Sequence, residues 1–419
     1  MEIINLKDNI TLYYLKDAKY KTTSVTAYVN RKLNRDEVTK NALLAKVLAR
    51  GTNKYNTIAG LNRHLENLYG TLYSIDVMKK SNVQCLFCSV SNISDRFSGE
   101  DITKQSVELL LDFLFDPYLP DGTFDKDYVE GEKQNLKDDI EAIINDKRSY
   151  ANMRVIEEMC MGEDNAIMDC GYVEDLDDID NVNLYEHYKS IMFSSPIDIF
   201  VVGDTDIDII KNLISDYLDK FSFNIEPIKS CKNIKTAQDI KYVDESLNVN
   251  QGKLAIGLRT GTTIDDSTYY ALLVGNSVFG AGAHSKLFNN VREKMSLCYY
   301  ASSRLDKFNG LMVVSSGIEF KNYEKAKDEI LVQLDAVKQG DFTDDELEIS
   351  KRFIINSYNS FFDSPYMLRD YYFGQKFTKN KDTLSEAIDK VNKVSKQDVM
   401  KAFSSVMADT VYFLKGKEE

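Results

Sequence analysis

Two segments of the chain resemble each other and begin 226 residues apart, at positions 61 and 287. Leu61–Ser74 reads LNRHLENLYGTLYS and Leu287–Tyr300 reads LFNNVREKMSLCYY, and each pattern predicts a helix, a turn and a strand. Likewise, Ser194–Asp206 and Ala408–Lys417 each predict a short strand that ends at a glycine. Self-similarity at a fixed offset is typical of a repeated structural unit. The sequence therefore predicts one α/β unit that is used twice.

Within each predicted unit, strands come early and long helices come late. This order predicts an α+β fold: two homologous α/β units related by internal duplication, each with a mixed, mainly antiparallel sheet and helices packed on one face. The 419 residues suit two domains. Asn224–Asn248 is polar, contains Pro227 and is predicted to be a connector. We expect an N-terminal domain at residues 1–230 and a C-terminal domain at residues 245–419.

The predicted elements are strands Ile10–Tyr14, Thr23–Asn30 and Lys253–Arg259, hairpins Leu72–Val77/Val83–Val90 and Tyr299–Arg304/Leu311–Ile318, and long helices Tyr128–Met161 and Asp344–Phe362.

Charge and composition exclude several classes of protein. The chain has 52 basic and 66 acidic side chains and a formal net charge of −14, which argues against a nucleic-acid binder. Apolar runs stay well short of the roughly 20 residues that span a bilayer, and the N-terminus does not read as a signal peptide. Six cysteines are too sparse for a disulfide framework. These features predict a cytoplasmic protein.

The residues by themselves indicate no metal site. The three histidines, His64, His187 and His284, lie far apart in the sequence, so no H-x-x-E-H pair exists. Cys85 and Cys88 form a C-x-x-C in a strand-like segment, but a zinc ribbon needs a second pair.

The segment from Ser285 to Tyr300 carries a specific resemblance. Its pattern S-x-L-F-x-x-V-R-E-K-x-S-L-x-Y is similar to the C-terminal-domain signature of the pitrilysin-like (insulinase) family of zinc peptidases. The repeated unit, the V-V-G-D strand and Tyr150-Ala151 resemble the bacterial two-domain members that lack the metal motif. The resemblance implies the fold of that family over almost the whole chain.

Active members carry H-x-x-E-H on the first helix, followed five residues later by Gly-Thr. Counting back from Gly51-Thr52 places Ala42, Ala45 and Lys46 at the three motif positions. Alanine offers no ligand atom, and an ammonium group repels Zn²⁺. The resemblance therefore implies a degenerate metal site and no zinc in this chain.

A third ligand in the family is a glutamate seven residues after another acid. Glu132 and Asp139 match that spacing, with the shorter Asp139 at the ligand position. Lys46 could form an ion pair with either acid in place of the metal, or the acids could belong to a solvated helix face. The sequence leaves this choice open.

The resemblance also implies that Arg292 and Tyr299 are retained from the family's catalytic machinery. In active relatives an arginine and a tyrosine at this spacing approach the substrate carbonyl. A guanidinium and a phenol can stabilise the oxyanion that forms when water attacks a peptide bond. Tyr300 competes with Tyr299 for this role, but adjacent residues of a strand face opposite ways.

These features favour a non-catalytic subunit. Its expected partner is a homologous peptidase subunit that carries H-x-x-E-H and zinc, to which this chain supplies Arg292 and Tyr299 in trans for binding peptide substrates. The alternative is a purely structural or interaction protein that kept the fold. A free-standing metallopeptidase with unusual ligands is disfavoured, and homodimers are expected to be possible in isolation.

Overall fold

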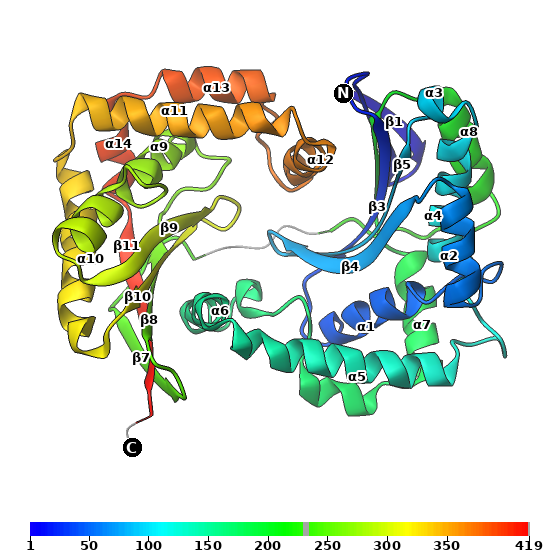
Figure 1. The fold of residues 1–419 in the computed structure, drawn as a ribbon, viewed down its shortest axis with the longest axis horizontal. Coiled ribbons are helices and arrows are strands. Elements are labelled where there is room, and N and C mark those ends of the chain that lie inside the picture. Colours follow the sequence, from blue (N-terminus) through cyan, green and yellow to red (C-terminus); the bar gives the residue numbers. More distant parts are fainter. Residues whose placement is uncertain (229–233, 418–419) are drawn as a thin grey trace. The chain divides into compact units, whose positions relative to one another are not determined.

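The computed structural model describes residues 1–228 and 234–417. Its contacts divide the chain into two compact units (Figure 1). Unit 1 comprises residues 1–142, 167–231 and 365–371, and unit 2 comprises residues 143–166, 232–364 and 372–419. This division differs from the expected contiguous domains, because each unit also includes a short segment from the other half of the chain. The change between Cys231 and Lys232 lies outside the described residues.

A six-stranded sheet forms the centre of unit 1. Its order is β1 (Glu2–Lys7), β2 (Ile10–Lys16), β6 (Ile197–Gly203), β3 (Thr22–Lys32), β5 (Val83–Ile93) and β4 (Leu72–Lys80). Only β2 and β6 pair in parallel, and the other neighbours are antiparallel. The mixed, mainly antiparallel sheet expected from the sequence is therefore confirmed.

Helices cover the apolar face of this sheet. They are α1 (Val38–Leu48), α2 (Ile58–Asn67), α4 (Ile102–Phe115), α5 (Lys126–Ala142), α7 (Asn181–Met192) and α8 (Ile207–Leu218), with the short α3 at Asp95–Ser98. Alternate sheet residues such as Val25, Ala27 and Val29 share a core with buried leucines of α1 and α4. The side chains of each strand alternate between the two faces of the sheet, and the apolar face packs against amphipathic helices to form this layer.

Unit 2 repeats the topology of unit 1. Its five-stranded sheet has the order β7 (Lys241–Leu247), β11 (Met407–Gly416), β8 (Gly252–Arg259), β10 (Leu311–Ile318) and β9 (Cys298–Asp306). The one parallel pair, β7 with β11, corresponds to the parallel pair β2 with β6 of unit 1. The order matches β2-β6-β3-β5-β4, so the predicted duplication holds in strand order and direction. The prediction of a connector at Asn224–Asn248 was wrong at its C-terminal end, because Lys241–Leu247 is a strand.

The helices of unit 2 are α9 (Tyr269–Phe279), a π-helix (Leu287–Lys294), α10 (Tyr323–Gln339), α11 (Asp344–Phe361), α13 (Leu384–Asn392) and α14 (Lys396–Phe403). They share one core with β8 and β10. No helix in residues 1–228 and 234–417 is long and apolar enough to cross a membrane.

The predicted helix Tyr128–Met161 is interrupted in the structure. A 3-10 turn at Ile143–Asn145 separates α5 from α6 (Lys147–Met159). Asp146 accepts hydrogen bonds from the backbone N–H groups of Arg148 and Ser149 and so begins a new helix. At this point the chain passes from unit 1 to unit 2, where α6 packs on β8, β10 and β11.

A second helix, α12 (Pro365–Gly374), contributes residues 365–371 to unit 1. The Arg369 guanidinium donates hydrogen bonds to the hydroxyls of Thr26 (2.5 Å) and Ser89 (3.4 Å). Asp370 forms an ion pair with Lys80 at 2.7 Å. Thr26 and Ser89 face away from the core shared with α1 and α4, so α12 packs on the opposite face of the sheet. The expectation of helices on one face therefore holds for most helices but not for α12.

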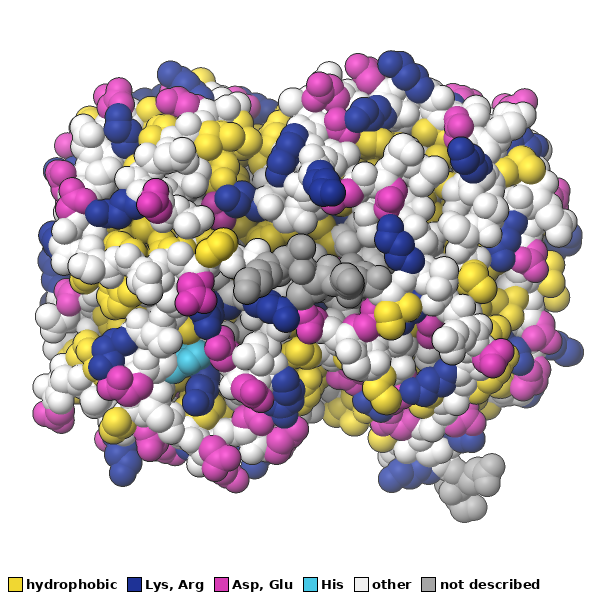
Figure 2. All heavy atoms as spheres, turned by 180° about the vertical axis from the view of Figure 1, so that it is seen from behind, with side chains coloured by type: hydrophobic (Ala, Val, Ile, Leu, Met, Phe, Trp, Pro, Cys, Tyr) yellow, Lys and Arg dark blue, Asp and Glu magenta, His cyan; other side chains and the backbone are white. Residues whose placement is uncertain are grey.

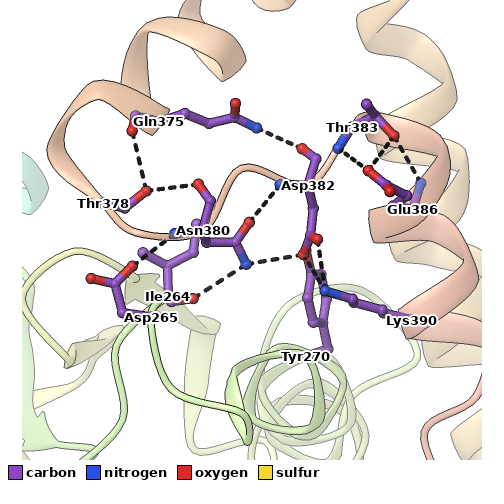
Figure 3. A network of polar contacts seen from close by, with 10 residues as sticks. All are labelled: Ile264, Asp265, Tyr270, Gln375, Thr378, Asn380, Asp382, Thr383, Glu386 and Lys390. Atoms are coloured by element: carbon purple, nitrogen blue, oxygen red, sulfur yellow. Dashed lines mark hydrogen bonds and ion pairs between the residues drawn. The ribbon is translucent and has the colours of Figure 1, made fainter.

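After α12 the chain returns to unit 2 through a loop held by polar contacts (Figure 3). The Asp382 carboxylate accepts hydrogen bonds from the Tyr270 hydroxyl at 2.7 Å and from Asn380 at 3.0 Å, and it pairs with Lys390 at 2.6 Å. Thr383 then caps α13 reciprocally with Glu386.

Arg259 of β8 fixes the end of α6 to the sheet of unit 2. Its guanidinium, 3% exposed, pairs with Glu163 at 2.6 Å and Asp409 at 2.7 Å and donates to the carbonyl of Met159. We expect Arg259→Ala to lower the free energy of unfolding by about 3–5 kcal/mol, because it leaves two buried carboxylates without their cation. Urea denaturation followed by circular dichroism measures this change.

The matched control is Lys415→Ala, which removes an exposed pair with Asp244 and should cost less than about 1 kcal/mol. Equal losses in the two variants would contradict the prediction.

Candidate functional site

Helix α1 carries the three positions at which the family resemblance implies metal ligands. The side chains of Ala42 and Ala45 are buried in the core of unit 1. Lys46 extends from the same helix, and its ammonium lies 2.6 Å from the Asp139 carboxylate on α5. Of the two acids that the sequence left open, Lys46 therefore pairs with Asp139.

The other acid, Glu132, has a different cation. The Arg50 guanidinium, just after α1, forms an ion pair with Glu132, and Asn135 donates a hydrogen bond to the same carboxylate at 3.0 Å. Arg50 was missed in the sequence, although it follows Lys46 by four residues, the spacing that places two side chains on one face of a helix. Two ion pairs thus connect α1 to α5.

These residues do not fit a zinc ion. Two of the positions offer only methyl groups, the third is a cation, and both nearby carboxylates already have cationic partners. Across the part of the chain that the structure describes, no group of three or more His, Cys, Asp or Glu side chains could hold a metal. Cys85 and Cys88 are buried thiols in β5, and burial raises the pKa of both.

The Gly-Thr pair after α1 has a structural reason to be retained. Gly51 adopts a φ of +154°, and a Cβ there would lie 2.4 Å from the carbonyl oxygen of Tyr55. Thr52 forms an isolated antiparallel bridge with Pro117. The turn that follows the metal motif in active relatives therefore persists here without the metal.

The Arg50–Glu132 pair is more buried than Lys46–Asp139, since the Glu132 side chain is 10% exposed and the Asp139 side chain 66%. We expect Arg50→Ala to reduce the free energy of unfolding by about 2–3 kcal/mol, because Glu132 loses its charge partner. Lys46→Ala should cost less than about 1 kcal/mol. Thermal and urea unfolding of the two variants tests this order, and the reverse order would refute it.

The three histidines have structural partners. The His187 Nε2 lies 2.7 Å from the Asn41 side-chain oxygen, and Asn41 donates to Gln84 at 2.7 Å. His64 stacks on Tyr55, and His284 lies 3.1 Å from the Ser277 hydroxyl. His284 lies in a turn before the π-helix. No histidine is available at the degenerate metal positions.

Burial lowers the pKa of His187 from 6.5 to about 4. The folded state therefore favours the neutral ring. Between about pH 6.5 and pH 4 the unfolded chain binds a proton that the folded chain does not, so the free energy of unfolding falls as the pH is lowered through this range. We expect His187 to lower the free energy of unfolding by up to about 2 kcal/mol between pH 7.5 and pH 5.

His187→Gln keeps a donor to Asn41 but cannot titrate in this range. Urea denaturation at the two pH values should show a smaller loss of stability for this variant than for the wild type. Equal losses would mean that His187 does not cause the effect.

In unit 2, Arg292 lies on the π-helix Leu287–Lys294. The buried side chains of Leu287 and Val291 hold this helix against the core. The Arg292 side chain is 40% exposed, and its Nε lies 3.6 Å from the Glu293 carboxylate. Its guanidinium lies over the Phe288 ring, 4.6 Å from the ring centroid. Such π-helical turns occur often at functional sites.

Tyr299 lies at an irregularity of β9. Ile318 pairs with Cys298 and Gly317 pairs with Tyr300, so Tyr299 is an extra residue without a cross-strand partner. Its side chain is 60% exposed. A β-bulge of this kind re-aims a side chain and is frequent next to active sites. The sequence predicted a regular strand here and could not reveal the bulge.

Tyr300 is occupied elsewhere in unit 2. Its ring lies under the Arg148 guanidinium of α6, at 4.2 Å from the centroid. It also lies across Gly317, where a Cβ would approach the ring to 2.5 Å. Tyr299 is therefore the more accessible of the two adjacent tyrosines.

A depression of about 670 Å³ in unit 1 is lined by none of these residues. It is found at the ends of β2 and β6, and its lining includes Lys16, Asp204 and Asp206.

Comparison with known proteins identifies the family. A family model described as "Peptidase M16 inactive domain" matches residues 178–354. The chain is 36% identical, over all of its length and 98% of the other chain, to the "Probable inactive metalloprotease YmfF" of Bacillus subtilis (strain 168). The chain belongs to the M16, or pitrilysin-like, peptidase family. The resemblance inferred from the Ser285–Tyr300 segment is thereby confirmed.

Two further proteins are similar to this M16 chain, one in its fold and one in part of its sequence. Its fold matches the crystal structure of a conserved protein from Enterococcus faecalis V583, with a TM-score of 0.93, 28% identity and coverage of 100% of this chain and 99% of that one. The "Uncharacterized zinc protease YmfH" of Bacillus subtilis is 27% identical over 188 residues, 44% of this chain and 42% of that protein. The M16 fold of this chain is therefore established.

Proposed function

We propose that this chain is the non-catalytic subunit of a heterodimeric zinc metallopeptidase. The observation that supports the proposal is an asymmetry between its two candidate sites. The metal positions are occupied by Ala42, Ala45 and the Lys46–Asp139 pair, whereas Arg292 and Tyr299 lie exposed on irregular backbone. A chain without any catalytic role would not require the exposed Arg292 and Tyr299 side chains.

The occurrence of two related proteins in one organism supports pairing. Bacillus subtilis has both a protein named as an inactive metalloprotease and one named as a zinc protease, and this chain is similar to each. The partner that we propose is a homologue of the second kind, with H-x-x-E-H. Nucleic acid is not among the proposed ligands, because the net charge is −14 and Figure 2 shows acidic and basic side chains interspersed on the face it draws.

In the proposed complex, zinc in the partner supplies the activated water for peptide-bond hydrolysis. This chain binds the substrate carbonyl through the Arg292 guanidinium and the Tyr299 hydroxyl. Both groups donate hydrogen bonds, so both stabilise the negative charge that develops on the carbonyl oxygen in the transition state. Neither has to move a proton for this role, which agrees with the permanent charge of arginine.

The alternative is a structural subunit without a catalytic contribution. The Lys46–Asp139 and Arg50–Glu132 ion pairs favour this alternative, because they stabilise unit 1 without zinc. The two functions differ in one measurable respect, the dependence of activity on Arg292.

The test is to mix this chain with a zinc-bearing M16 homologue from the same organism and to follow cleavage of a quenched fluorescent peptide library. We expect activity from the mixture and not from either chain alone. Arg292→Ala should lower kcat/KM by about 10²–10³. Size-exclusion chromatography should show that the variant still forms the complex.

Arg304→Ala is the matched control, because Arg304 is an exposed arginine on the same strand as Tyr299. It should leave cleavage unchanged. Full activity of Arg292→Ala would assign the chain a structural role. A full equivalent of zinc in the purified chain alone, with peptidase activity, would refute the proposal altogether.

A further inference from the structure

The Arg292 guanidinium has an aromatic neighbour on its own helix. The charged group lies over the face of Phe288, four residues earlier on the π-helix, at 4.6 Å from the ring centroid. A planar guanidinium stacked on an aromatic face keeps its N–H edges free for other acceptors. The contact with Glu293, at 3.6 Å, is longer than a hydrogen bond and leaves those edges available.

Phe288 is itself well fixed. Its backbone N–H donates to the Ser285 hydroxyl at 3.3 Å, and its neighbour Leu287 is fully buried. On the other side, Asn290 donates to Gln333 of α10 at 2.6 Å and so ties the π-helix to the next helix. The helix segment that carries the Phe288 ring is therefore held against unit 2, whereas the long Arg292 side chain has several rotatable bonds.

We propose that Phe288 is a positioning residue for Arg292: its ring fixes the plane of the guanidinium so that the N–H edge is presented to a peptide carbonyl. The inference rests on the proposed function for its catalytic consequence. The positioning itself is a property of the isolated chain. A pre-organised donor costs less ordering entropy when the transition state forms, so its effect belongs in kcat more than in KM.

The activity test compares Phe288→Leu with Phe288→Tyr in the complex with the zinc-bearing subunit. Phe288→Leu removes the π-face, and we expect a two- to fivefold fall in kcat with little change in KM, roughly the range for a cation–π contact at an exposed site. Phe288→Tyr keeps the ring and should keep the rate. In the Arg292→Ala background, Phe288→Leu should have no further effect, since the two residues act as one unit.

A second measurement needs no partner. Relaxation of the Arg292 Nε–H group by NMR in the isolated chain should show a more mobile guanidinium in Phe288→Leu than in the wild type or Phe288→Tyr. Equal mobility in all three would overturn the positioning role, whatever the activity. So would a Phe288→Leu defect that persists in the Arg292→Ala background, because it would then reflect folding.

The two proposals fail in different ways. If cleavage does not depend on Arg292 but Arg292 is ordered by Phe288, the proposed function fails and the positioning remains. If cleavage depends on Arg292 and is unchanged in Phe288→Leu, the function remains and the positioning fails.

Discussion

A β-sheet has two faces, and in this protein the helices of one half of the chain cover only one of them. In unit 2, α6 leaves the N-terminal half and buries Ala151 and Val155 against Ala255, Tyr412 and Leu414. In unit 1, α12 comes from the C-terminal half and places Arg369 on Thr26 and Ser89. The burial of the second faces thus depends on segments about 100 residues or more away in the sequence, whereas the capping of α6 at Asp146 is local. Duplication gave two similar sheets, and this exchange makes each unit depend on the whole chain.

The degenerate metal site follows from simple electrostatics. Helices α1 and α5 bring Glu132 and Asp139 towards the positions where active relatives hold a divalent cation. Without a metal, the largely buried Glu132 carboxylate needs positive charge, whereas Asp139 is mostly exposed. Lys46 and Arg50 supply it as two ion pairs. The geometry of the motif is therefore kept by cations that belong to the chain.

Unit 1 lacks metal ligands at the family's positions, whereas unit 2 keeps Arg292 and Tyr299. The proposed function rests on this contrast. Arg292 and Tyr299 lie on the two least regular pieces of backbone in that part of the fold, a π-helix and a β-bulge. Leu287 and Val291 pack the π-helix against the core of unit 2. The result is a charged group and a phenol that are exposed and still held in place.

Much of this protein could be predicted from its sequence. Hydrophobic periodicity located most strands but not β1 or β7, and it located only some of the helices. The repeat predicted the duplicated unit, and the spacing from Gly51-Thr52 located the positions that lack metal ligands. The periodicity and the motif spacing are local signals, and the repeat is recognised because each copy is itself a local pattern. The break at Ile143–Asn145, the partner of Lys46, the role of Arg50 and the bulge at Tyr299 were decided only by the tertiary structure. The break also has a local signal in the capping residue Asp146, which was missed in the sequence. The two ion pairs and the bulge depend on which distant element packs alongside, and such packing leaves no fixed spacing in the sequence.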